Sequence, residues 1–247
     1  MIHITDEENS WKISYTNPST QKPTELRLDK RLLDNGRYFT QEDALCLLRE
    51  TGQELPSLPE ETELRVALFL EREQPDPVQR SLIHKVREAL IEDAQRRVML
   101  TSSRITHYPN GQVSFTPKYD LDRAQGEQES TAVTLNVASQ PTSFEYLTSG
   151  PYSYLAGYLP EDTLQTMYGP MPASLISEAW KWTTGTQKVR HFWKHNQVPR
   201  SIEKIIAIYR PFMMPGWTFD LSADDWTRGN VRPRQRQERP ADLKLPV

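Results

Sequence analysis

Ala173–Pro211 has the sequence ASLISEAWKWTTGTQKVRHFWKHNQVPRSIEKIIAIYRP, and its residue pattern suggests a chemistry as well as a fold. Apolar residues recur at helical spacing from Ala173 to Trp182, and the pattern breaks at Gly185. A second helix is predicted over Thr186–His195 and a third over Ser201–Tyr209, with the serine as its N-cap. The stretch therefore predicts three short helices joined by tight turns.

The predicted middle helix carries polar and basic side chains on its exposed side. Arginine and lysine can bond phosphates and guanine, and glutamine can bond adenine. A nucleic-acid interface is therefore predicted here, and the residues assigned to it are Thr186, Gln187, Lys188, Arg190, His191, Lys194 and Arg200.

The same segment resembles the helix-turn-helix of phage-repressor-like (Cro-type) DNA-binding domains. In that family a small residue lies in the first helix and another at its end, and Ala179 and Thr183 stand at those spacings. An aliphatic residue and then an aromatic residue follow in the recognition helix, as Val189 and Phe192 do, before a Val-Pro pair at residues 198–199. The resemblance is confined to this segment and implies that its middle helix contacts DNA.

Charge is divided unevenly along the chain, although the formal net charge is only −3. Residues 41–99 hold 13 acidic and 8 basic side chains, whereas residues 173–210 hold seven basic and two acidic ones. Residues 228–247 add six basic side chains against two acidic ones. Because a local positive field attracts a polyanion, the basic C-terminal third favours a nucleic-acid partner. The acidic N-terminal half favours oligomerisation or a protein partner.

The first 140 residues combine strand and helix patterns, which predicts an α+β fold. Residues 11–15 and 25–28 alternate as short strands, and Asn110-Gly111 predicts a hairpin over residues 104–116. An Asp-Pro pair opens a long helix predicted over residues 76–100.

Three domains are predicted along the chain. The first is a mixed strand and helix domain, and the second is a small helical domain, rich in tryptophan and tyrosine, that contains the helix-turn-helix-like unit. The third is an extended basic tail, which is either an arm for nucleic acid or a solubilising terminus. Their boundaries are 1–140, 141–222 and 223–247.

Composition argues against several classes of protein. No apolar run approaches the length of a membrane span, so no membrane partner is expected. The single cysteine, Cys46, lies among leucines, which predicts a buried, inert thiol in a reducing, cytoplasmic location. The chain has no nucleophile elbow and no phosphate-binding or dinucleotide-binding glycine motif, so no catalytic residue and no cofactor are predicted. His191 and His195 are four residues apart but lack further ligands, so no metal site is predicted.

Two functions stay open at this point. The first is DNA binding by a regulatory protein or a component of a DNA-handling complex. The second is a non-enzymatic subunit of a multi-protein assembly, of phage or other origin. That subunit would bind its partner, or further copies of itself, through the aromatic side chains of residues 144–226, because aromatic residues concentrate binding energy at interfaces.

Overall fold

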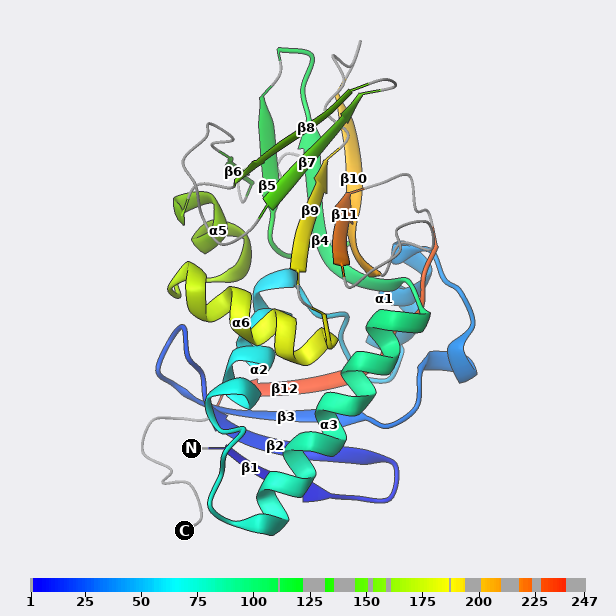
Figure 1. Cartoon of the computed structure of the whole chain (residues 1–247). Coiled ribbons are helices and arrows are strands. Elements are labelled where there is room, and N and C mark those ends of the chain that lie inside the picture. Colours follow the sequence, from blue (N-terminus) through cyan, green and yellow to red (C-terminus); the bar gives the residue numbers. More distant parts are fainter. Residues whose placement is uncertain are drawn as a thin grey trace.

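The structure is a computed structural model with five α-helices and two β-sheets in its described part, which confirms the α+β class (Figure 1). The described residues are 2–110, 112–121, 132–135, 145–150, 153–158, 161–186, 188–193, 201–209, 218–223 and 228–238. None of the helices in these ranges combines the length and the apolar composition needed to cross a membrane.

The first sheet is antiparallel and has four strands in the order β1-β2-β3-β12. Burial alternates along β1 and β3, whereas most residues of β2 are buried, and β2 and β3 confirm the two strands predicted from alternation. The fourth strand comes from the C-terminal part of the chain and lies beside β3 (Figure 1). The strand bounds are β1 Ile2–Asp6, β2 Ser10–Thr16, β3 Pro23–Asp29 and β12 Arg234–Glu238.

The second sheet is mixed and has eight strands in the order β6-β5-β4-β10-β11-β9-β7-β8. Its β4–β5 pair is the predicted hairpin, in which Tyr108 N–H donates to the carbonyl of Gln112. β9 runs parallel to both of its neighbours. The strand bounds are β4 Met99–His107, β5 Val113–Thr116, β6 Val133–Thr134, β7 Glu145–Gly150, β8 Ser153–Tyr158, β9 Lys188–Trp193, β10 Ile202–Tyr209 and β11 Thr218–Ala223.

Helix α2 lies at the centre of the molecule and packs on two hydrophobic clusters. Leu64, Ala67 and Leu68 join the cluster beneath the first sheet, whereas Leu58 and Val66 join the cluster that contains α5, α6 and the second sheet. The helix is therefore buried almost all round, although it also carries charged residues. The helix bounds are α1 Gln41–Glu50, α2 Leu58–Leu70, α3 Pro77–Arg96, α5 Glu161–Tyr168 and α6 Ala173–Thr184, with a short 3-10 helix η1 at Leu33–Gly36.

Side-chain caps open three of these helices. Thr40 accepts a hydrogen bond from Asp43 N–H at 3.1 Å, and Asp76 accepts one from Val78 N–H at 2.8 Å. Ser57 and Glu60 form a reciprocal capping box at the start of α2. Such caps satisfy N–H groups that have no partner within the helix. The long predicted helix ends at Arg96, four residues early, because Met99 begins β4.

The helix-turn-helix prediction is only partly matched by the structure. The first helix exists as α6, and it ends at Gly185, which adopts the left-handed conformation with φ of 66°. The second and third predicted helices are wrong, since residues 188–193 form β9 and residues 202–209 form β10. The apolar residues of IEKIIAIY fit a helical spacing, but four of the eight residues are isoleucine, and β-branched side chains favour strands.

The C-terminal segment also differs from its prediction. Residues 234–238 of the expected extended tail form β12 within the first sheet, and Val231, Arg232 and Arg234 are buried. β10 pairs with β4 in the second sheet, so both sheets contain strands from each side of the boundary placed at residue 140. The basic tail is thus partly built into the fold.

Candidate functional site

Four charged residues lie on the first half of the central helix α2. Glu61, Glu63 and Arg65 are buried, and the side chain of Glu60 is only 17% exposed. A helix buried on all sides is normally apolar, because an unpaired charge in the protein interior is costly. The three carboxylates outnumber Arg65, so they require further counterions from elsewhere in the chain.

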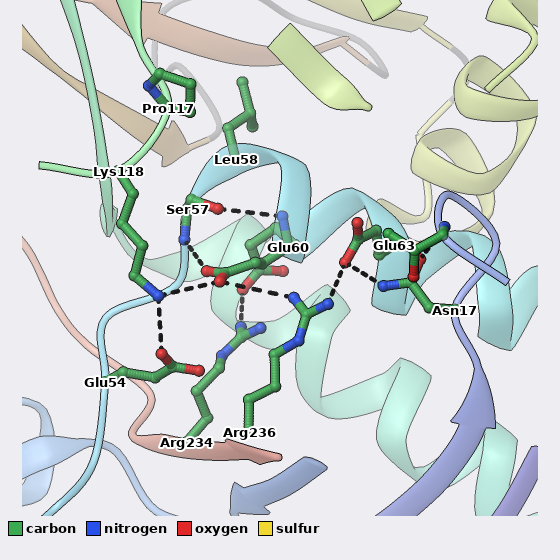
Figure 2. Close-up of polar contacts among 12 residues, drawn as sticks. Asn17, Glu54, Ser57, Leu58, Glu60, Glu63, Pro117, Lys118, Arg234 and Arg236 are labelled. Atoms are coloured by element: carbon green, nitrogen blue, oxygen red, sulfur yellow. Dashed lines mark hydrogen bonds and ion pairs between the residues drawn. The ribbon is translucent and has the colours of Figure 1, made fainter. Parts of the chain in front are cut away.

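β12 supplies two of the counterions, as Figure 2 shows. Arg234 bonds Glu61, and the Arg236 guanidinium lies 2.8 Å from Glu63 and 3.6 Å from Glu60. Asn17 donates a further hydrogen bond to Glu63 at 2.9 Å. Within α2, Arg65 pairs with Glu61 at 3.3 Å and lies over the Trp180 ring of α6. Charged residues of α2 thus join the C-terminal strand to the middle of the molecule.

Lys118, which follows β5, supplies the remaining cation. Its ammonium group lies 2.9 Å from Glu54 and 3.1 Å from Glu60 (Figure 2). Burial opposes the charged form of this lysine, but the two carboxylates outweigh it and raise the pKa of Lys118. Burial likewise opposes the charged form of Glu60, but Lys118, the Ser57 N–H and Arg236 lower the pKa of this carboxyl.

We call these eight residues the α2 ion network. It contains four carboxylates and four cations, so it is neutral as a whole. Arg234 and Arg236 form ion pairs with Glu61 and Glu63 inside the protein, so they are not available to a polyanion as a basic C-terminal arm would require. The network members are Glu54, Glu60, Glu61, Glu63, Arg65, Lys118, Arg234 and Arg236.

A pocket of about 360 Å³ opens beside this network, and we call it the α1 pocket. Helix α1, the loop that follows it and residues 118–121 form its walls. The surface of the pocket is more apolar than polar, and its apolar side chains include Leu45, Leu48, Leu55 and Leu121. A predominantly apolar pocket with a few polar groups and a volume of this size is typical of a small-molecule site.

Four charged residues stand among the leucines on the pocket wall. Lys118 and Glu54 form one pair, and Arg49 and Asp120 approach each other at 3.7 Å to form the other. Glu54 contributes only one oxygen to its pair, since Oε1 is buried without a hydrogen-bond partner in the described part of the chain. Such an orphan acceptor is uncommon in folded proteins and marks a place for a donor.

The frame of the pocket is held in place from several directions. Glu54 N–H donates to the Arg234 carbonyl at 2.8 Å, and Tyr119 N–H donates to the Ser102 carbonyl at 2.7 Å. Arg104 stacks on the Tyr119 ring at 3.3 Å and bonds Gln41 at the start of α1 at 2.5 Å. The pocket is therefore fixed by contacts with both sheets.

A second cavity, of about 350 Å³, lies at the turn between β1 and β2 and has a polar wall. Two of its three carboxylates are already bonded: Glu7 to Arg27 and Ser10, and Asp29 to Gln53. With less apolar surface and with two of its carboxylates already bonded, this cavity is a weaker candidate than the α1 pocket.

The structure does not gather the predicted nucleic-acid-binding residues on one exposed helix. Thr186 is buried, and its hydroxyl lies 2.8 Å from that of Thr184. Lys188, Arg190 and His191 belong to β9. Gln187, Lys194 and Arg200 lie outside the described residues. The backbone register sets Arg190 opposite Glu145 of β7 and Asp220 of β11, so two acidic positions neighbour this basic one.

Two further predictions concern single residues or groups near the site. Cys46 is exposed, so the prediction of a buried thiol is wrong: α1 turns Ala44 and Leu48 to the core, and Cys46 falls on the other side. Trp180 and Tyr168, members of the expected aromatic interface, are fully buried against each other. In the described ranges, no group of three or more His, Cys, Asp or Glu side chains could hold a metal ion.

No family model, curated protein or solved structure matches this chain. The site must therefore be judged from its own geometry. Sequence reasoning missed both the α2 ion network and the α1 pocket. One signal was present: Arg232, Arg234 and Arg236 alternate with other residues, and a period of two places side chains on one face of a strand.

Proposed function

We propose that this protein is a non-enzymatic binding protein that captures a small organic molecule in the α1 pocket. The observation that carries the proposal is an apolar pocket of about 360 Å³ whose wall holds a carboxylate oxygen without a partner. The pocket suits a small ligand better than a protein partner, because a stable protein interface needs a broad surface of about 800 Å² on each side.

The frame around the pocket supports the proposal further. A site that is formed before the ligand arrives loses less conformational entropy on binding. The backbone of Glu54 is paired with β12, Lys118 is held by two carboxylates, and Tyr119 is stacked by Arg104. The polar groups of the wall therefore occupy defined positions without a ligand.

A fragment screen by amide NMR tests this proposal. We expect several compounds to shift the amides of Gly52, Gln53 and Lys118 in a saturable way. Leu45→Trp should abolish these shifts by filling the pocket, whereas Leu70→Trp, the same change at an exposed position at the end of α2, should leave them unchanged. Binding that is equal in both variants, or a screen without a saturable binder, would overturn the proposal.

Nucleic-acid binding through Lys188 and Arg190 is a second proposal, in which strand β9 replaces the recognition helix. The favouring observation is that Lys188 and Arg190 occupy alternate positions of β9, and alternate positions of a strand share a face. A titration against duplex DNA at several salt concentrations tests it, since each neutralised phosphate contributes a log–log slope of about −0.9. Binding that is absent at low salt, or unchanged in Lys188→Ala/Arg190→Ala, would contradict it.

A further inference from the structure

Among the described residues that line the α1 pocket, Glu54 has a buried side-chain oxygen without a hydrogen-bond partner. Its Oε2 binds Lys118, while Oε1 is buried and has no hydrogen-bond partner there. A buried acceptor without a donor loses its hydration and gains nothing in return. Because the terminal torsion of a glutamate is broad, Oε1 can turn toward a donor placed in the pocket.

The electrostatic surroundings of Glu54 favour a positively charged donor. Lys118 sits between Glu54 and Glu60, and these carboxylates raise the pKa of the lysine despite its burial. The same carboxylates attract a second cation that enters this end of the pocket, where it competes with the Lys118 ammonium group for Glu54. Asp120 adds a further carboxylate to the wall. Hydrogen bonds between an ammonium group and a carboxylate are roughly twice as strong as those between neutral groups.

The remaining wall selects for an apolar body. Leu45, Leu48 and Leu55 come from α1 and the loop after it, and Leu121 comes from the opposite side. Each apolar group that leaves water for this wall gains free energy in proportion to its area. An occupant with an apolar body and one charged donor at its end satisfies both parts of the pocket.

We propose that the α1 pocket binds primary amines that carry a small apolar body, with the ammonium group bonded to Glu54. This inference rests on the proposed function, since it assigns a ligand class to the same pocket. It assigns no carboxylate or phosphate to Glu54, because such a group supplies no donor and is repelled by this carboxylate, while the two cations on the wall, Lys118 and Arg49, are already paired with Glu54 and Asp120.

Three probes with one body and different end groups test the inference: phenethylamine, phenethyl alcohol and hydrocinnamate. Their affinities are measured by amide NMR titration of the whole chain. We expect phenethylamine to bind at least about tenfold more tightly than hydrocinnamate, with the alcohol between them. Shifts should centre on Gln53, Glu54 and Lys118, and they should disappear in Leu45→Trp.

Two variants move the amine affinity in opposite directions. Glu54→Gln should weaken phenethylamine about tenfold while leaving the alcohol within about twofold, since only a charge-assisted bond is lost. Lys118→Met should strengthen phenethylamine, because it removes the ammonium group that competes for Glu54. Glu50→Gln is the matched control: it makes the same charge change at the end of α1, outside the pocket wall, and should alter neither affinity.

The possible outcomes separate this inference from the proposed function. Equal binding of all three probes in the pocket, or tighter binding of hydrocinnamate, overturns the amine assignment and leaves the pocket as a binding site. Failure of the three probes while uncharged fragments bind also overturns it. Failure of every fragment overturns the proposed function itself.

Discussion

Replacing Arg234 with alanine removes the most deeply buried cation of the α2 ion network. The Arg234 side chain is 2% exposed and its partner Glu61 is 9% exposed. Removing one partner of a buried ion pair costs about 3–5 kcal/mol, because the other charge stays behind in the interior. Glu61 keeps Arg65 at 3.3 Å, so we expect the lower end, about 3 kcal/mol.

The assay is urea unfolding followed by circular dichroism, together with the midpoint of thermal unfolding. For a chain of this length, a loss of about 3 kcal/mol corresponds to roughly 6–12 °C in the thermal midpoint. Arg27→Ala is the matched control, since Arg27 lies on the adjacent strand β3, is 53% exposed and pairs with Glu7. An exposed pair of this kind contributes at most about 1 kcal/mol. A cost below about 1 kcal/mol for Arg234→Ala, or one equal to that of Arg27→Ala, would refute the assignment of β12 as the source of counterions for α2.

Three further predictions concern other parts of the molecule. Burial alone would raise the pKa values of Glu60 and Glu61, but their cationic neighbours lower both below the ordinary 4.5. The stability that these two carboxylates contribute is therefore present above pH 4.5 and is lost as the pH falls through their pKa values in the folded protein. Glu60→Gln should flatten this acid limb of a plot of unfolding free energy against pH, and an unchanged limb would argue against the ion pairs. The exposed thiol of Cys46 should react with an aromatic disulfide reagent in the native state, and a thiol that reacts only after denaturation would contradict its exposure. Cys46→Ser should change the unfolding free energy by less than about 0.5 kcal/mol. Gly185→Ala should lower the free energy of unfolding in urea by about 1–2 kcal/mol, because an L-residue is strained at the φ of 66° that ends α6. An unchanged free energy of unfolding would show that this turn has another conformation.

Much of the N-terminal half could be predicted because its signals are local. The caps Thr40 and Asp76, the alternation of β2 and β3, and the Asn-Gly turn each act within a few residues of the chain. Such signals do not depend on distant contacts, and the structure confirms them. The α+β class followed from their order.

The second half could not be predicted in the same way because its strands depend on distant partners. The segment KVRHFW offered basic residues that suit an exposed helix, yet it pairs in parallel with β7 and β11. In β10, helical and strand periodicities fit the same isoleucines, and pairing with β4 decides between them. Tertiary context overrides a local pattern of this kind.

The candidate site was hidden for a related reason. Its residues come from α1, the loop after α1, α2, β12 and the segment after β5, and no sequence motif joins these segments. The arginines of β12 resembled a disordered basic arm by composition, but their alternation places them against the glutamates of α2. A buried helix with several carboxylates, such as α2, predicts cations elsewhere in the fold without saying where they are.

A crystal structure of the protein with phenethylamine tests directly whether the α1 pocket is a binding site. We expect ligand density against Leu45, Leu48 and Leu55, with the amine nitrogen about 2.7–3.2 Å from Glu54 Oε1. An empty pocket at saturating phenethylamine, or a ligand bound only elsewhere on the surface, would contradict it.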